Sequence, residues 1–132
     1  MFKLVLHISD LDKWPAALNN VRNTMNALQS DQRPFEIAVI ANAAAVKGYL
    51  ETDIRTQISQ LLETAINLSA ADRDNSHTAS LKFFACHNSL TGQNIAPTAL
   101  NPPEASSIIE IVPVAIIALV EHQNAGFAYI KP

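Results

Sequence analysis

The sequence predicts one α/β domain, a three-layer α/β/α architecture built on a mainly parallel sheet of five strands. Three observations lead to this class. Short apolar runs alternate with segments of helical periodicity, which is typical of a parallel sheet covered by helices on both faces. The 132 residues suffice for one compact domain, and 48% of them are hydrophobic. No internal repeat, low-complexity tract or linker divides residues 1–132, so a single domain is expected.

The first half of the chain predicts two strands and two helices. Residues 2–7 are a short apolar run between polar residues, and residues 35–41 are rich in β-branched side chains, so each predicts a strand. Residues 13–29 predict a helix because their apolar side chains recur at helical spacing, with Pro15 near the start. A shorter helix is expected over residues 43–50.

The alternation continues after this helix. Apolar side chains share one face of a helix expected over residues 54–68. Residues 71–80 are polar and predict a loop. Residues 81–86 are mostly apolar and predict the third strand. A short helix or turn is expected over residues 89–94, and an irregular stretch with three prolines follows it.

The last part of the chain predicts two more strands and a helix between them. Residues 108–112 form the fourth strand, and residues 126–130 form a short fifth one. Pro113 is expected to begin a helix that runs to about residue 123. The apolar residues 116–120 face nearly every side of this helix, which predicts burial on more than one side.

Composition and charge argue against several classes of function. The formal net charge is −3 and the nine basic residues are scattered, so a nucleic acid partner is not expected. The apolar stretch 114–120 is too short to span a bilayer, and the amino terminus lacks a complete signal core, so no membrane association is expected. The single cysteine, Cys86, cannot form an internal disulfide, which fits a reducing cytoplasm.

The sequence also lacks the motifs of common cofactor sites. With only three glycines, the chain has neither a dinucleotide-binding fingerprint nor a phosphate-binding loop, so the expected architecture is Rossmann-like without that fingerprint. No two histidines have the spacing of metal ligands, and one cysteine cannot build a structural zinc site. Neither a cofactor nor a metal is expected.

Polar and reactive side chains stand where the expected strands end. His7 ends the first strand, Asn42 follows the second, and Cys86 ends the third with His87 and Asn88 directly after it. The carboxyl ends of parallel strands lie along one edge of a sheet, which is where ligands bind in open α/β folds. These residues are therefore expected to converge into a small active site or binding cleft.

Cys86 is the candidate nucleophile of this group. The thiolate is the reactive form of cysteine, and its pKa falls near a helix N-terminus or a cationic imidazole. Asn88 and Ser89 can cap a following helical turn and so bring backbone N–H groups close to the thiol. His7 is the better candidate for a proton partner, because His87 directly follows Cys86 and would face the other way on a continuing strand.

A purely structural role stays open for these residues. An inert, buried thiol is the common state of cysteine in an apolar strand. His7 can bond a neighbouring carbonyl, and Asn42 can serve as a helix N-cap, the interpretation that its position alone favours. His77 and His122 lie among polar residues and are expected at the surface.

Several segments together resemble one known family. They are Lys13-Trp14 with Leu18-Asn19-Asn20, Val39-Ile40-Ala41-Asn42-Ala43-Ala44-Ala45-Val46, Phe84-Ala85-Cys86-His87-Asn88-Ser89-Leu90-Thr91-Gly92, Val112-Pro113 and Gly126-Phe127-Ala128-Tyr129-Ile130-Lys131-Pro132. In this order and spacing the chain resembles the DsrE-like proteins, which include DsrE, DsrF and TusD of the sulfur relay. Its ending resembles an uncharacterised branch. Thr91 stands where an arginine is common, and Ala43 stands where a glycine is common.

The resemblance implies a five-stranded parallel fold that assembles into trimers or hexamers. It also implies that Cys86 carries sulfane sulfur as a persulfide between donor and acceptor proteins, in the manner of a sulfurtransferase. Two other functions stay open. One is a non-catalytic, oligomeric module that binds a small molecule or anion in the cleft at the carboxyl ends of the strands. The other is a scaffold whose apolar last helix forms subunit contacts.

Overall fold

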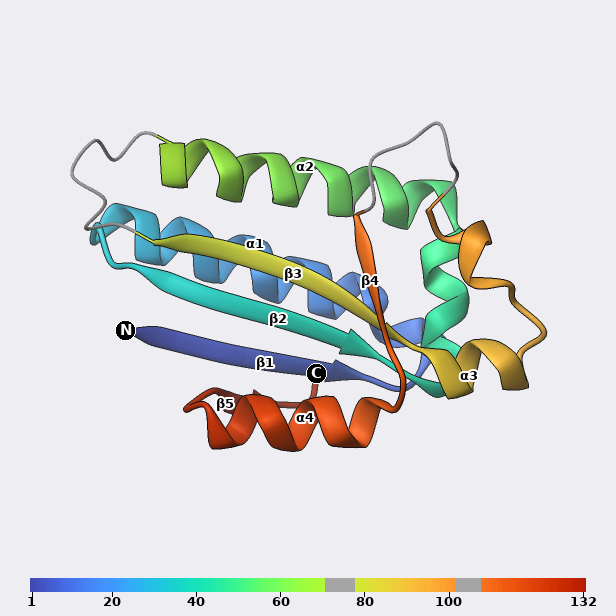
Figure 1. Cartoon of the computed structure of the whole chain (residues 1–132). Coiled ribbons are helices and arrows are strands. Elements are labelled where there is room, and N and C mark those ends of the chain that lie inside the picture. Colours follow the sequence, from blue (N-terminus) through green and yellow to red (C-terminus); the bar gives the residue numbers. More distant parts are fainter. Residues whose placement is uncertain (71–77, 102–107) are drawn as a thin grey trace.

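The computed structural model describes residues 1–70, 78–101 and 108–132, which form one five-stranded parallel sheet (Figure 1). The strands lie side by side in the order β4-β3-β2-β1-β5. Their bounds are β1 Phe2–Ile8, β2 Phe35–Ala41, β3 Ala79–Cys86, β4 Ile109–Val112 and β5 Ala128–Ile130. The predicted fold class is confirmed.

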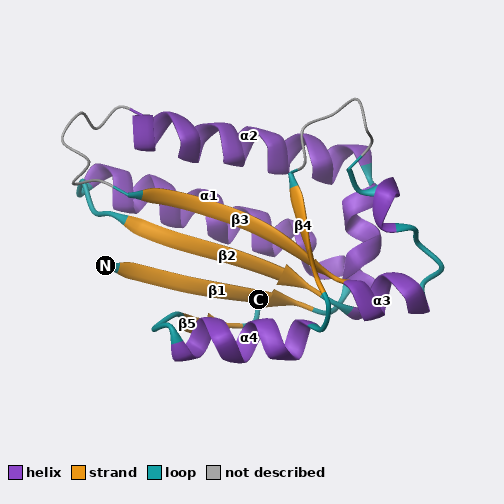
Figure 2. Cartoon of the chain, in the orientation of Figure 1, coloured by secondary structure: helices purple, strands orange, loops and turns teal. Residues whose placement is uncertain are grey.

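Helices cover both faces of this sheet (Figure 2). The face packed by α1 and α2 carries the larger core, and α4 covers the other face. The helices are α1 Trp14–Ser30, α2 Thr52–Ala70, α3 His87–Gly92 and α4 Ala115–Asn124, and the 3₁₀ turns are η1 Leu11–Lys13, η2 Ala43–Leu50 and η3 Pro97–Ala99. These are the three layers that the alternation of strands and helices predicts.

The larger core is anchored by Trp14 at the start of α1. Its ring is fully buried, packs edge-on against Tyr49 at 5.0 Å between centroids, and donates a hydrogen bond from Nε1 to Ala45 O at 2.8 Å. Gly48 lies directly against the indole, so that a Cβ at this position would overlap the ring. These contacts hold η2 against α1, and η2 follows directly after Asn42 at the edge that carries the candidate site.

The smaller core lies between the sheet and α4. Ala115, Ala118 and Leu119 of this helix pack on a cluster of sheet residues that includes Phe84 and Cys86. The opposite side of the helix is open to solvent, since Ile116, Ile117 and Val120 are 67%, 57% and 49% exposed. The prediction that α4 is buried on more than one side is therefore wrong for the isolated chain, because no element among the described residues covers its outer face.

Several element boundaries differ from the prediction. β3 begins at Ala79, within the expected loop, because the ladder with β2 extends to the pair Phe35–Ala79. α3 begins at His87 instead of residue 89. α4 begins at Ala115 instead of Pro113, since Val114 is still extended and takes the N-cap position. The expected irregular stretches 71–77 and 102–107 lie outside the described residues.

Candidate active site

The strand order places three of the predicted site residues on neighbouring strands. The register pairs His7 with Ile40 on β2, and Ala41 with Ala85 on β3. Cys86 and Asn42 therefore directly follow the last pair of the ladder between β3 and β2, and Cys86 itself pairs with Val112 on β4. Because side chains alternate along a strand, His7 and Cys86 both project toward the face that α4 covers.

Cys86 is nearly buried, yet its sulfur is surrounded by hydrogen-bond donors. Only 4% of its surface is exposed, and Ala115 N, at the start of α4, donates to Sγ at 3.4 Å. Burial alone would raise the pKa of the Cys86 thiol, but hydrogen bonds from the Ser89 hydroxyl and from three backbone N–H groups hold that pKa below its usual range. The three N–H groups belong to Ser89, Ala115 and Asn88. They stabilise the thiolate, which is the form that reacts.

Ser89 also ties the thiol to the neighbouring strand end. Its Oγ accepts a hydrogen bond from Ala43 N at 2.8 Å, across 46 residues of sequence. Ala43 has φ +50°, in the left-handed region that glycine favours. The glycine common at this position in the resembling family would adopt this conformation without strain, whereas alanine adopts it at a cost.

His7 lies within a cluster of polar side chains drawn from three strand ends. Its Nδ1 lies 2.7 Å from the hydroxyl of Tyr129 on β5, and its Nε2 lies 3.0 Å from Asn42 Oδ1. Ser9 Oγ donates to the same Asn42 Oδ1 at 2.8 Å and lies 3.1 Å from His7 Nε2. The neighbouring carbonyl that His7 bonds is the side-chain carbonyl of Asn42, and the other ring nitrogen faces the Tyr129 hydroxyl.

The imidazole of His7 is held in its neutral form. Burial lowers its pKa below the ordinary value, the bond to Asn42 opposes this, and the positive charge of Lys131 lowers it further. Asn42 Oδ1 has no proton, so Nε2 must carry the hydrogen of that bond. A neutral ring then accepts at Nδ1 from the Tyr129 hydroxyl.

Asn42 occupies the position of an N-cap but does not act as one. It precedes η2, with φ −135° and ψ 179°, and its side chain makes no capping hydrogen bond. Oδ1 is instead directed to His7 on β1 and to Ser9, which directly follows that strand. The capping role that its position favoured is therefore wrong.

The two residues directly after Cys86 lie outside this polar cluster. His87 and Asn88 are exposed at the start of α3, and Asn88 N lies 3.4 Å from Pro113 O. The structure thus brings together Cys86, Asn42 and His7 at one edge, while His87 points to solvent beside them.

His122 is half-buried, which corrects its expected place on the surface. Its ring packs edge-on between Phe84 and Phe127, at 5.5 and 4.9 Å between centroids, and Nδ1 donates to Ala118 O at 2.7 Å. Its place is therefore in the small core under α4. His77 lies outside the described residues.

Sequence reasoning missed three residues of the site, Ser9, Tyr129 and Lys131, and named Ser89 only as a cap of the following helical turn. Ser9 lies two residues after His7, which ends the predicted first strand, and this position was a usable signal. Tyr129 belongs to the last strand, which pairs with β1 at Leu4–Ala128 and Leu6–Ile130, and Lys131 follows directly after that strand. The sequence carried no sign that this strand joins the sheet beside His7.

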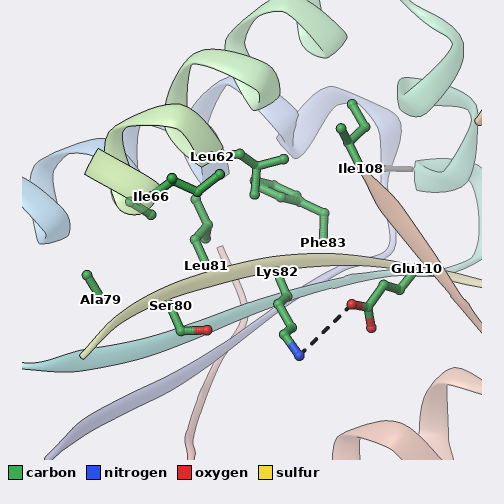
Figure 3. A pocket seen from close by; sticks show the side chains of 10 residues that line it. Leu62, Ile66, Ala79, Ser80, Leu81, Lys82, Phe83, Ile108 and Glu110 are labelled. Carbon is green, nitrogen blue, oxygen red and sulfur yellow. Dashed lines mark ion pairs between the residues drawn. The ribbon is translucent and has the colours of Figure 1, made fainter. Parts of the chain in front are cut away.

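An open pocket of about 430 Å³ lies away from this edge (Figure 3). Leu62 and Ile66 of α2, Leu81 and Phe83 of β3, and Ile108 give it an apolar lining. Figure 3 shows the alternation along β3, with Leu81 and Phe83 directed to α2 and Lys82 to the opposite side, where it pairs with Glu110. The pocket reaches no closer to Cys86 along β3 than Phe83, three residues away, and it includes none of the predicted site residues.

In the described ranges, no group of three or more His, Cys, Asp or Glu side chains is arranged to hold a metal ion. Within the same ranges, no helix has both the length and the apolar composition needed to cross a membrane.

Comparison with solved structures shows two proteins of similar fold. One is a protein of unknown function, MTH1491 from Methanobacterium thermoautotrophicum, with 21% identity, full coverage of both chains and a TM-score of 0.73. The other is the YchN protein from E. coli, with 12% identity, full coverage of both chains and a TM-score of 0.60. YchN has a DsrE-like fold, so these likenesses support a DsrE-like fold for this chain. No protein-family model and no curated protein matches the sequence.

Proposed function

We propose that the protein is a sulfur carrier, which accepts sulfane sulfur on Cys86 and passes it to a partner protein. The observation that carries this proposal is the environment of the thiol. Ala115 N donates to Sγ at 3.4 Å, and this bond, together with the Ser89 hydroxyl and the N–H groups of Ser89 and Asn88, holds the pKa of the thiol below its usual range although only 4% of Cys86 is exposed. Donors arranged around a sulfur atom favour its anion, and a structural thiol in an apolar core has no need of them.

The donors also suit each step of the transfer. The Cys86 thiolate attacks the outer sulfur of a donor persulfide, a new S–S bond forms at Cys86, and the donor cysteine leaves as a thiolate. Delivery reverses these roles, with an acceptor thiolate attacking the outer sulfur on Cys86. Sγ carries the negative charge before loading, gives it up when the new S–S bond forms, and regains it as the leaving group in delivery. Hydrogen-bond donors around Sγ therefore favour the thiolate that begins loading and stabilise the thiolate that leaves in delivery.

Mass spectrometry tests this proposal. Protein incubated with a low-molecular-weight persulfide is expected to gain the mass of one sulfur atom and to lose it on reduction. The Cys86→Ser variant is expected to gain nothing, because the chain has no other cysteine. Thr91→Ala, which removes an exposed hydroxyl from α3, serves as the matched control and should load like the wild type. A wild-type protein whose mass stays unchanged would overturn the sulfur-carrier function.

A non-covalent binding module is the second candidate. The observation that favours it is the cationic side chain of Lys131 beside a cluster of neutral hydrogen-bonding groups, His7, Asn42 and Tyr129. A small anion suits such a site. Its binding would raise the melting temperature of the wild type and of Cys86→Ser equally. Stabilisation that requires Cys86 would favour the carrier function instead.

We also propose that the chain associates with copies of itself. Five large apolar side chains are 40–67% exposed on α4 and β5, namely Ile116, Ile117, Val120, Tyr129 and Ile130. An exposed apolar surface of this kind marks contacts between proteins. Light scattering is expected to give a mass above that of the 14.3 kDa chain, and Ile116→Lys should lower it. A monomeric wild type would refute the association.

We propose the cytoplasm as the location of the protein, because a carrier of persulfide sulfur suits a reducing compartment.

A further inference from the structure

The carboxamide of Asn42, in the polar cluster beside Cys86, has a fixed orientation to which the proposed carrier function assigns no role. Asn42 Oδ1 is the meeting point of two donors, Ser9 Oγ at 2.8 Å and His7 Nε2 at 3.0 Å. His7 belongs to β1 and Ser9 follows directly after the last residue of that strand, so both donors lie on the β1 side of β2. The oxygen of the Asn42 carboxamide is thereby fixed toward β1. The two ends of a carboxamide diverge, so Nδ2 is turned away from β1.

Cys86 lies on the other side of Asn42. The pair Ala41–Ala85 is the last in the β2–β3 register, so Asn42 and Cys86 are the next residues of their strands. The backbone after Asn42 is fixed as well, since Ala43 N donates to Ser89 Oγ and the Ser89 hydroxyl bonds the Cys86 sulfur. The hydrogen bonds of the Asn42 side chain to other described residues involve Oδ1, and none involves Nδ2. Because no buried side-chain nitrogen of the described residues lacks a partner, Nδ2 of this half-buried residue is open to solvent. An N–H₂ donor is thus available at the side of the thiol.

We propose that His7 and Ser9 are positioning residues that hold the Asn42 amide so that its N–H₂ group binds the outer sulfur of a persulfide on Cys86. This inference rests on the proposed carrier function. The donors already described surround Sγ itself, and Asn42 is not one of them. A persulfide places a second, charged sulfur about 2 Å beyond Sγ. Asn42 supplies a donor for that outer atom.

Tyr129 completes the orientation of His7. Its hydroxyl lies 2.7 Å from Nδ1 and donates to the neutral ring, which places the remaining ring proton on Nε2 toward Asn42. If the carboxamide were turned round, Nδ2 would donate to Nε2 and the ring proton would move to Nδ1. The protonation state of the two ring nitrogens therefore reports which way the amide faces.

The first test is the tautomer of His7, measured from the nitrogen-15 shifts of its ring at about pH 8, where the imidazole is neutral. The His7→Gln variant identifies the signal by its disappearance. We expect a protonated Nε2 and an unprotonated Nδ1 in the wild type. Protonation of Nδ1 instead would mean that the amide donates toward β1, and would overturn the inference whether or not the protein carries sulfur.

The second test is persulfide loading of Cys86 in the Asn42 variants. Loss of one charge-assisted hydrogen bond predicts that Asn42→Ala lowers the equilibrium constant for loading about tenfold. Asn42→Asp keeps an acceptor for Ser9 and His7 but has no N–H₂ group, so it should not restore loading. Asn20→Ala, an exposed carboxamide on α1, is the control and should load as the wild type does.

The positioning role of His7 has its own readout. His7→Gln keeps an N–H donor for Asn42 Oδ1, so it should load far better with sulfur than His7→Ala. If His7 had a merely structural role, the two variants would differ in loading only where they also differ in stability. Urea unfolding of both variants measures that stability. Equal loading by wild type and Asn42→Ala would overturn the inference while leaving the carrier function intact. A wild type that takes up no sulfur would instead overturn the carrier function, and with it the proposed role of Asn42.

Discussion

The Ser89→Ala substitution tests the proposed cause of the thiol's acidity. It removes one of the four hydrogen bonds to the Cys86 sulfur and leaves the three backbone N–H groups in place. A hydrogen bond to a charged group contributes about 1.5–3 kcal/mol, against about 1 kcal/mol for a neutral one. Ser89 is half-buried, so solvent replaces part of the lost hydrogen bond in the variant. The substitution therefore costs the thiolate about 1 kcal/mol more stabilisation than it costs the thiol.

This difference translates into a reaction rate. Since about 1.4 kcal/mol is a factor of ten, the thiolate fraction at neutral pH is expected to fall roughly fivefold in Ser89→Ala. The second-order rate of alkylation by iodoacetamide, followed from acid to alkaline pH, measures that fraction directly. The profile of the variant should move to higher pH and reach a similar plateau.

Two controls sharpen this measurement. Ser89→Thr keeps a hydroxyl and should retain the wild-type profile, and Thr91→Ala removes a hydroxyl from the same helix without touching the sulfur. If Ser89→Ala superimposed on the wild type, the side-chain hydrogen bond would not be a cause of the lowered pKa. An equal displacement in Thr91→Ala would show that the change comes from the helix as a whole.

Three further predictions concern stability. Ala43→Gly should raise the free energy of unfolding, measured by urea denaturation, by about 0.5–1 kcal/mol, because the relief of the left-handed φ exceeds the entropy cost of glycine. An unchanged or lower free energy of unfolding would show that Ala43 is not strained. Gly48→Ala should lower it by roughly 1–3 kcal/mol or more, because the new Cβ overlaps the Trp14 ring, and near-wild-type stability would contradict this packing. The pKa of His7 is lower in the folded chain than in the unfolded one, so the unfolded chain binds the proton first as pH falls. The stability that His7 contributes is therefore present above about pH 6.5 and is lost as pH falls through its folded pKa, and His7→Gln should flatten this part of the pH profile of the urea midpoint; an unchanged slope would refute it.

The fold was predictable because it depends on local periodicity. Apolar runs of strand length and stripes of helical spacing each specify an element from a few neighbouring residues, as in the strand at residues 35–41, whose bounds were predicted without error. The boundaries that failed depend on pairing. β3 begins at Ala79 because Phe35 on β2 pairs with it there. The residue type of Ala79 does not by itself predict that the strand starts at this position.

The candidate site was predictable in part for the same reason. Polar residues after apolar runs identify strand ends, and parallel strands gather their ends at one edge, which was enough to place His7, Asn42 and Cys86 together. The direction of each side chain was not predictable. Asn42 had the sequence position of a cap, yet in the folded chain its oxygen accepts from His7 on β1 and from Ser9 just after that strand.

By itself, the sequence determined the class of the fold, its single sheet and the presence of one thiol at a strand end, since these follow from residue types and their spacing along the chain. The tertiary structure decided what surrounds that thiol. Strand order is not encoded in local periodicity, and it is the order β3-β2-β1-β5 that brings Tyr129 and Lys131 to His7. The acidity of Cys86 likewise comes from Ser89 and from Ala115, whose N–H reaches the sulfur across 29 residues only once the chain has folded.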